Sequence, residues 1–352
     1  MELSKAERLR VSVMKRALRV LLRSPTTRDA LAKNRGARAA QVEPETAAML
    51  RLDDLSGDSV LNGRTADQAR RAMCINIAVT DLPAPDDVSI TPLTLETDSG
   101  PLPARLYHAR GVPQGAPGIV FYHGGGFVTG DLDTHEGLCA RMSQLARVRV
   151  ISVEYRLAPE HPFPAAPEDC VAAFRAITKI AEAHGVDSKR LAVMGDSAGG
   201  NLSAVVALKT RGDAIQPALQ VLVYPGLDMR RSLPSHAQLG VGWFLTTDMI
   251  NWFYDHYSGK DEAVALNPDA SPLLAPDVSG VCPALVYVAG LDPLRDEGLA
   301  YAARLSEAGV DVQTKDFTHL IHGFLLMTAA SPGSAEAVVH IAKDVAQALK
   351  AR

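Results

Sequence analysis

Strand-like and helix-like segments alternate along most of this 352-residue chain, and that alternation restricts its fold more than any other feature. Six short apolar runs have strand character, and they cover residues 118–122, 148–155, 191–194, 219–224, 284–289 and 312–317. The segments between them are long enough for helices, and the last, 334–349, has apolar residues at helical spacing. Strands joined through helices pair in parallel, so the sequence predicts a mostly parallel sheet with helices on both faces.

Two further strand-like runs precede this region. Residues 88–97 and 102–108 alternate apolar and polar side chains, and Ser99-Gly100-Pro101 separates them. This pattern predicts an antiparallel hairpin at an edge of the sheet. The fold class that we expect is therefore α/β, with eight strands of which most are parallel.

One segment, 226–267, interrupts the alternation because it contains no strand pattern. Both tryptophans of the chain, Trp243 and Trp252, lie in it, together with several phenylalanines and tyrosines. We expect a helical insertion over the strand ends, with aromatic side chains facing a pocket. A peripheral helix packed on the core explains the same composition, and each interpretation can hold for different residues.

The strand at 191–194 leads into Gly195-Asp196-Ser197-Ala198-Gly199, and a helical segment follows to about Lys209. The pattern G-x-S-x-G between a strand and a helix is typical of a nucleophile elbow. Glycines let the two elements approach closely, and a serine on such a turn presents its hydroxyl at the positive end of the helix. A glycine- and serine-rich turn without a catalytic role is the alternative. Other motifs in the chain are needed to distinguish the two interpretations.

A second glycine-rich loop, His123-Gly124-Gly125-Gly126-Phe127, follows the strand at 118–122 directly. Consecutive glycines remove side chains, so that backbone N–H groups can approach a ligand oxygen. For acyl transfer that oxygen is an oxyanion, and we expect the N–H groups of Gly125, Gly126 and Ala198 to face it. The loop lacks the lysine and Ser/Thr of a phosphate-binding loop. His123 is expected to anchor the loop by hydrogen bonding.

An elbow serine needs a histidine base and an acid that orients it, in the chain order Ser, Asp or Glu, His. His322 follows the last predicted strand and precedes Gly323, which lets the loop turn the imidazole inward. His319 in the same loop is the alternative candidate for the base. Asp292 follows the strand at 284–289 and is the predicted acid.

Asp296 and Glu297 come shortly after Asp292 and fall in the first turn of the next predicted helix. Acids are favoured there by the helix dipole, which is a sufficient structural explanation for both.

The composition excludes several classes of function. A net charge of −4 gives no electrostatic case for nucleic acid, and no apolar run approaches the length of a membrane span. The four cysteines show neither paired nor metal-ligand spacing, which indicates buried thiols in a reducing compartment and no metal site. We therefore expect a cytoplasmic protein.

The N-terminal segment 5–23 has seven Lys/Arg against one acid, interleaved with apolar residues, and this predicts a basic amphipathic helix. No uninterrupted apolar core or cleavage site follows, so we do not expect a signal peptide. A helix that covers the active-site side of the protein is the simpler interpretation, and a helix on a membrane surface is the alternative.

Four blocks together resemble the hormone-sensitive lipase family of α/β-hydrolases. They are the glycine loop at 123–127, the elbow at 195–201, the segment Asp292-Pro293-Leu294-Arg295-Asp296-Glu297-Gly298, and His322-Gly323-Phe324. The segment from Tyr155 to Asp169 resembles that family's further signature, and the resemblance spans about residues 85–350.

The resemblance implies a triad of Ser197, Asp292 and His322, with an oxyanion hole at Gly125, Gly126 and Ala198. It implies a helical cap from residues 1–60 and 226–267 on a catalytic domain from 61–225 and 268–352. Members of this kind are carboxylesterases on short-chain esters, need no cofactor and often form homodimers.

Three alternative functions remain at this stage. An amidase or lactonase can use the same triad, and a long-chain lipase is possible on the same fold. A binding module that lost catalysis is the rival from another class, but such proteins lose a triad member and all three residues are present here.

Overall fold

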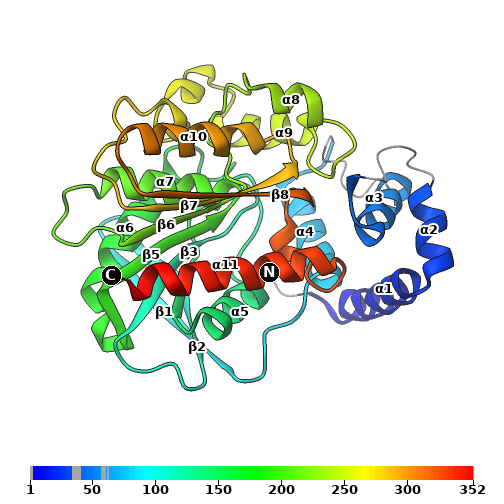
Figure 1. Cartoon of the computed structure of the whole chain (residues 1–352), viewed down its shortest axis with the longest axis horizontal. Helices are drawn as coiled ribbons and strands as arrows, with labels where there is room; N and C mark the ends of the chain where they lie inside the picture. Colours follow the sequence, from blue (N-terminus) through cyan, green and yellow to red (C-terminus); the bar gives the residue numbers. More distant parts are fainter. Residues whose placement is uncertain (1–2, 34–40, 57–60, 62, 352) are drawn as a thin grey trace.

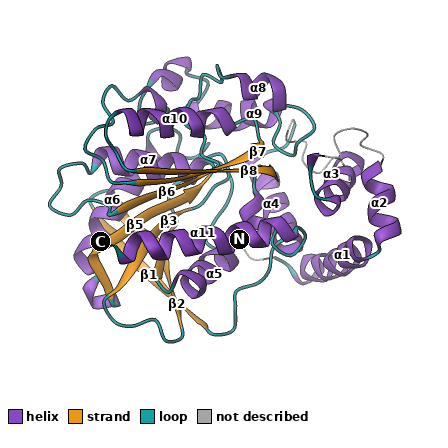
Figure 2. Cartoon of the chain, in the orientation of Figure 1, coloured by secondary structure: helices purple, strands orange, loops and turns teal. Residues whose placement is uncertain are grey.

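A single sheet of eight strands runs through the protein (Figures 1 and 2). The computed structural model describes residues 3–33, 41–56, 61 and 63–351. The strand order is β1-β2-β4-β3-β5-β6-β7-β8, with bounds β1 Val88–Thr97, β2 Gly100–Ala109, β3 Ala116–Tyr122, β4 Arg149–Val153, β5 Val186–Asp196, β6 Leu219–Val223, β7 Ala284–Leu291 and β8 Val312–Ile321. From β4 to β8 all pairings are parallel, which confirms the predicted fold class.

The predicted hairpin forms the antiparallel edge of this sheet. Strand β1 pairs with β2 from Val88↔Ala109 to Thr97↔Gly100, and β2 pairs antiparallel with β4. The turn is tight because Gly100 has a positive φ of 110° and the Thr97 hydroxyl donates to its carbonyl oxygen over 2.6 Å.

Helices cover both faces of the sheet, as the sequence predicts. Helices α5 (Glu136–Ala146) and α11 (Pro332–Lys350) share one face, and α6 (Ala165–Ile180), α7 (Ala198–Lys209) and α10 (Arg295–Glu307) lie on the other. Strand β3 shows the alternation, since Ile119 and Phe121 pack with α5 and α11 whereas Val120 and Tyr122 pack toward α6. Such residues, buried on both faces, are expected of a central parallel strand.

Two element ends differ from the predicted bounds. Strand β8 continues to Ile321, beyond the predicted end at 317, because a register shift between β7 and β8 lets Leu291 pair with Ile321. The helix expected over 166–184 ends at Ile180, and a separate 3₁₀ turn, Glu182–His184, precedes β5. The first difference matters for the site because it brings residue 322 to the end of a strand.

The described part of the N-terminal region includes the helices α1 Lys5–Arg23, α2 Pro25–Lys33, α3 Pro44–Ser56 and α4 Ala66–Thr80. Helices α1 to α3 lie beyond the end of the sheet toward which β7 and β8 point (Figure 1). Helix α1 matches the predicted basic helix and is fixed to α4 by an ion pair between Glu7 and Arg71. The predicted segment 1–60 also includes residues 1–2, 34–40 and 57–60, which lie outside the described residues.

The insertion between β6 and β7 contains helices α8 (Pro234–Leu239) and α9 (Thr247–Ser258), with a 3₁₀ turn at Glu262–Leu266. Both interpretations of its aromatic residues hold. Trp243 and Trp252 are buried in apolar clusters, whereas Phe253 and Tyr254 line a cavity.

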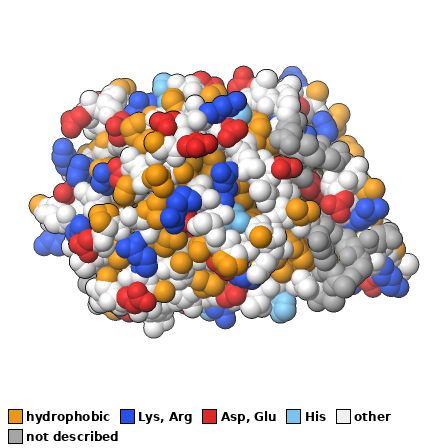
Figure 3. Space-filling model, turned by 90° about the horizontal axis from the view of Figure 1, so that it is seen from above, with side chains coloured by type: hydrophobic (Ala, Val, Ile, Leu, Met, Phe, Trp, Pro, Cys, Tyr) orange, Lys and Arg blue, Asp and Glu red, His pale blue; other side chains and the backbone are white. Residues whose placement is uncertain are grey.

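Charged side chains of both signs are interspersed over the face seen in Figure 3. All four cysteines are buried and none forms a disulfide. Among the described helices, none combines the length and the apolar character that crossing a bilayer requires.

Candidate active site

Ser197 sits on a sharp turn between β5 and α7. Its φ of 53° is positive, which is rare for a residue with a side chain and stores about 1–3 kcal/mol of strain. The flanking glycines are sterically required, because a Cβ at Gly195 would clash with the backbone of Gly199 and one at Gly199 with the carbonyl of Tyr122. The turn leaves the Ser197 side chain partly exposed on the wall of a cavity.

The structure brings Ser197, His322 and Asp292 together at the carboxyl ends of three parallel strands. His322 Nε2 lies 3.0 Å from Ser197 Oγ, and His322 Nδ1 lies 2.7 Å from Asp292 Oδ2. Since a carboxylate only accepts, Nδ1 carries the proton and Nε2 is free to accept from the serine hydroxyl. Asp292 is completely buried, and its other oxygen accepts from the Leu294 N–H over 2.9 Å.

The alternative candidate for the base, His319, is exposed on β8. Its Nδ1 lies 3.2 Å from the carbonyl oxygen of Gln41, which precedes α3. Of the two histidines that the sequence offers in this loop, only His322 contacts Ser197.

The glycine loop after β3 lines the same cavity as Ser197 and Ala198. Gly125 and Gly126 have positive φ angles of 122° and 61°. A Cβ at Gly125 would clash with the carbonyl of Thr129, and one at Gly126 with the ring of Phe253. No larger residue fits either position, so the loop presents bare backbone toward the serine.

His123 begins this loop, is completely buried and does not line the cavity. Its Nδ1 lies 2.9 Å from the carbonyl oxygen of Gly124, and its ring stacks on Tyr155 at 4.3 Å between centroids. Burial, with a smaller contribution from His135, lowers its pKa to about 4. The imidazole is therefore neutral near pH 7 and anchors the loop, as expected from the sequence.

Asp196 has a structural role that the sequence analysis does not identify. Its Oδ1 accepts from the Gly124 N–H over 2.8 Å and lies 3.2 Å from His135 Nε2. Burial alone would raise the pKa of this carboxyl, but His135, the Gly124 N–H and His123 outweigh it and hold the pKa below its usual value. Asp196 thus ties the elbow to the glycine loop as a buried carboxylate.

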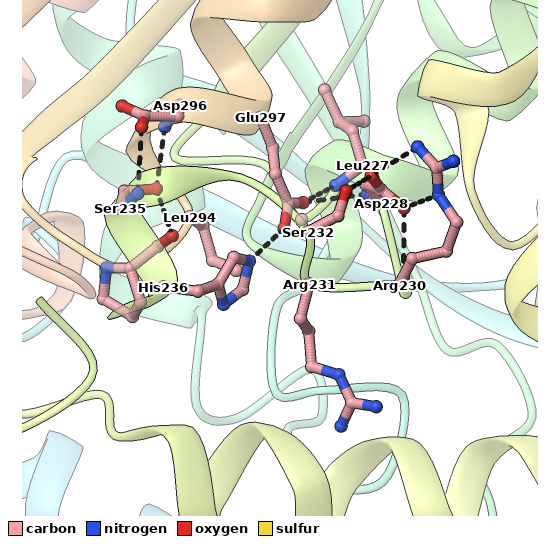
Figure 4. A network of polar contacts seen from close by, with 12 residues as sticks. Leu227, Asp228, Arg230, Arg231, Ser232, Ser235, His236, Leu294, Asp296 and Glu297 are labelled. Atoms are coloured by element: carbon pink, nitrogen blue, oxygen red, sulfur yellow. Dashed lines mark hydrogen bonds and ion pairs between the residues drawn. The ribbon is translucent and has the colours of Figure 1, made fainter. Parts of the chain in front are cut away.

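Glu297 also has a structural role that was not expected from the sequence. The helix dipole explains an acid in this turn, but Glu297 is completely buried and its Oε1 lies 2.6 Å from His236 Nε2 (Figure 4). Its other oxygen accepts from the N–H groups of Leu227 and Asp228. The loop after β6 is thereby fastened to the start of α10, directly after Asp292.

Asp296 adds a second contact to the same junction, since its Oδ2 accepts from the Ser235 N–H over 2.9 Å (Figure 4). The Ser235 hydroxyl in turn donates to the carbonyl oxygen of Pro293 over 2.6 Å. Asp296 and Glu297 differ from ordinary first-turn acids only in their contacts with residues far away in the sequence. The local sequence pattern does not show such contacts.

The cavity at Ser197 has a volume of about 510 Å³ and an apolar wall. Helices α1, α3 and α4 supply one side of it, through residues such as Leu18, Leu50 and Met73. Members of the segment 244–254 supply another side, and Ser197 and His322 line the same cavity. A cavity of this size is in the range of small-molecule sites. No cluster of side chains suited to a metal ion occurs among the residues that the structure describes.

Comparison with known proteins places the chain in a family. A family model described as the alpha/beta hydrolase fold matches residues 119–326. The carboxylic ester hydrolase LipN of Mycobacterium tuberculosis is 41% identical over 302 residues, which are 84% of this chain and 78% of LipN. The ethyl acetate hydrolase of Pseudomonas putida is 38% identical over 320 residues, which are 88% of this chain and 99% of that enzyme.

The chain belongs to the hormone-sensitive lipase family of α/β-hydrolases. A solved structure of the same fold, an ester hydrolase from the Lake Arreo metagenome bound to a bipyridine phosphonate derivative, superposes with a TM-score of 0.83 at 37% identity. The superposition covers 87% of this chain and 98% of that one. The expected enzyme class within the hormone-sensitive lipase family, a carboxylesterase, is confirmed by these relatives.

Proposed function

We propose that this esterase hydrolyses short- to medium-chain carboxylic acid esters through an acyl-enzyme on Ser197. The observation that supports this most is the continuous contact from Asp292 through His322 to Ser197 Oγ, over 2.7 and 3.0 Å. Those separations are within the range for direct proton transfer between serine and imidazole. No metal ion or cofactor enters the proposed reaction.

In the acylation step, Ser197 Oγ attacks the ester carbonyl carbon while His322 Nε2 takes the hydroxyl proton. The tetrahedral intermediate collapses when the C–O bond to the alcohol breaks, and His322 returns the proton to the departing alcohol oxygen. Asp292 keeps the proton on Nδ1 and stabilises the imidazolium that forms in between.

In the deacylation step a water molecule replaces the alcohol. His322 takes a proton from the water, the resulting hydroxide attacks the acyl carbon, and Ser197 leaves with the proton that His322 returns. The net change is one ester and one water converted to one acid and one alcohol, so the enzyme ends in its starting state.

The negative oxygen of both tetrahedral intermediates would be held by the N–H groups of Gly125, Gly126 and Ala198. Ala198 is the first residue of α7, where N–H groups have no partner within the helix. The bare loop at Gly125 and Gly126 supports the same assignment. Preset donors stabilise the transition state more than the planar ester, which raises the rate of the chemical step.

The preference for short to medium acyl chains is inferred from the cavity and the relatives. We assign the helical cap to residues 1–60 and 226–267, since α1, α3 and residues 244–254 wall the cavity. The apolar cavity, with a volume of about 510 Å³, suits a compact ester better than a long chain. The similarity to an enzyme named ethyl acetate hydrolase supports the same preference.

A chain-length series tests this function. We expect kcat/KM on p-nitrophenyl esters from acetate to palmitate to be greatest between acetate and octanoate, and to fall by orders of magnitude in Ser197→Ala. Dominant activity on palmitate would overturn the chain-length preference. Undiminished hydrolysis by Ser197→Ala would overturn the mechanism. Matched anilides and lactones in the same assay distinguish an ester hydrolase from an amidase or lactonase.

A further inference from the structure

Helix α1 has two apolar faces, and only one of them is covered by the protein. The inner face lines the cavity through Met14, Leu18 and Leu21, while Leu22 packs against α3. Polar contacts fix this orientation, since Lys15 donates to the carbonyl oxygen of Asp81 over 3.0 Å and Glu7 pairs with Arg71. Burial of the inner face therefore dictates which residues point outward.

The outward face carries Leu9, Val13 and Val20, with exposed fractions of 68%, 60% and 63%. On an ideal helix of about 100° per residue these three side chains fall within about 40° of one another. They form an apolar strip along one side of a helix of 19 residues, with Arg16 at its edge between Val13 and Val20. Exposed aliphatic residues that gather on one side of a helix indicate a contact surface, whereas scattered ones need no explanation.

Basic side chains flank the strip on both sides. Arg16 and Arg23 lie along one edge and Arg10 along the other, and all three are exposed. The helix has seven Lys/Arg and a single acid, Glu7, whose carboxylate is turned inward to Arg71. The outward face is thus apolar at its centre and positively charged at its margins, although the whole chain has a net charge of −4.

We propose that the outer face of α1, defined by Leu9, Val13 and Val20 with its basic margins, binds the surface of an anionic lipid membrane. A helix with this composition lies in the plane of the interface, with its aliphatic side chains among the acyl chains and its cations at the headgroups. Long arginine side chains can extend from the apolar strip to the phosphates, which is the arrangement that the margins offer.

A second copy of the chain fits this face less well. In a two-fold dimer the same patch would meet itself, so the bases of one α1 would face those of the other. Interface cores are depleted of charge, and a stable dimer buries about 800 Å² on each partner, more than a strip of three aliphatic side chains supplies. An anionic surface matches both the charge and the small apolar area.

Lipid binding at this face would place the cavity next to the membrane, because the same helix forms the cavity wall. If the proposed esterase function holds, an apolar ester dissolved in the lipid then lies one helix away from Ser197. This consequence rests on the proposed function, whereas the binding itself does not.

Sedimentation of the full chain with vesicles tests the proposal. We expect binding to phosphatidylglycerol/phosphatidylcholine vesicles, little binding to pure phosphatidylcholine, and release as salt rises from about 0.05 to about 0.5 M. The variant Leu9→Gln/Val13→Gln/Val20→Gln, and separately Arg10→Gln/Arg16→Gln/Arg23→Gln, should each lower the partition coefficient at least tenfold.

Val241→Gln/Leu266→Gln is the matched control, because these residues are similarly exposed, at 70% and 64%, but lie outside α1. It should bind as the wild type does, and circular dichroism should show the same unfolding temperature for every variant. Vesicle binding by the Leu9/Val13/Val20 variant equal to that of the wild type would overturn the proposal. So would a wild type that forms dimers in sedimentation velocity, while the variant is monomeric and neither protein binds vesicles. An inactive but vesicle-binding protein would contradict only the proposed function.

Discussion

Two adjacent glycines, Gly125 and Gly126, meet steric demands that no other residue satisfies. At Gly125 a Cβ would collide with a backbone carbonyl, which cannot move aside as a flexible side chain can. At Gly126 the ring of Phe253 occupies the space. Neither position has room for a side chain, so the two proposed oxyanion donors should be sensitive to a single added methyl group.

Gly125→Ala is expected to lower kcat/KM on p-nitrophenyl butyrate by about 10²–10³, the usual effect of losing an oxyanion donor. Gly212→Ala is the matched control, because Gly212 also has a positive φ, 87°, but nothing lies within 4 Å of a Cβ there. The control should keep wild-type kinetics. Similar losses in both variants would show that backbone strain, and not the donor geometry, determines the rate.

The buried Asp196 predicts a pH-dependent stability. Its pKa is held below the usual value, so the contribution to the free energy of unfolding is present above the unfolded pKa of about 3.9 and is lost as pH falls below it. Asp196→Asn keeps an acceptor for the Gly124 N–H but removes the charge. Urea unfolding should show a stability difference from wild type near pH 7 that shrinks toward pH 3. A difference independent of pH would contradict this account.

At the residue scale, chain order and strand position were enough to predict which serine, acid and histidine meet. The roles of Asp196 and Glu297 were not predictable in the same way. Their partners, Gly124 and His236, lie 72 and 61 residues away along the chain. No local pattern distinguishes such acids from a motif residue or a first-turn acid.

At the scale of elements, the pair of His236 and Glu297 joins the insertion to α10 (Figure 4). Burial raises the pKa of Glu297, and His236 and the backbone N–H groups oppose that rise. The buried carboxyl is held by His236 at Oε1 and by the N–H groups of Leu227 and Asp228 at Oε2, so removal of His236 takes away the partner of one buried oxygen.

His236→Ala should therefore lower the free energy of unfolding by about 1–3 kcal/mol. His340→Ala is the control, since His340 pairs with Asp344 one turn away on the exposed surface of α11 at 3.2 Å. Loss of that surface pair should lower the free energy of unfolding by at most about 0.5 kcal/mol. Urea denaturation measures both, and a small effect at His236 would mean that the loop is held by its other contacts.

The C-terminal end of β8 shows why some element bounds could not be predicted from the sequence. Thr318 and His319 are polar and exposed, so the pattern ends the strand at 317. The strand nevertheless continues because it pairs with the irregular end of β7. Gly290 allows this close approach, since a Cβ at that position would lie 2.5 Å from the Thr318 backbone. Such long-range pairing overrides local polarity.

At the scale of the whole molecule, the cavity is assembled from distant parts of the chain. The parallel sheet was predictable because its strands are apolar and regularly spaced. The arrangement of α2 and α3 was not, since residues 24–75 are polar and weakly patterned. Those helices are positioned by contacts that only the folded protein provides, such as Arg28 with Glu45 and Glu43 with Ser331.

Leu21→Ala tests whether α1 limits the acyl pocket. Removing this side chain from the cavity wall should shift the preference toward longer esters, with kcat/KM for octanoate relative to butyrate rising about fourfold for each extra methylene buried, at ~0.8 kcal/mol each. Leu9 of the same helix is exposed and does not line the cavity, so Leu9→Ala should leave the ratio unchanged. An unchanged ratio in Leu21→Ala would place the acyl chain elsewhere.

The central claim is that Ser197 is the nucleophile, activated by His322. Its most direct measurement is the mass of the protein and its peptides after reaction with an activated alkyl phosphonate ester. We predict one phosphonyl group per chain, on Ser197, with labelling abolished in Ser197→Ala and strongly slowed in His322→Ala. Labelling of any other residue in step with the loss of activity would contradict the account.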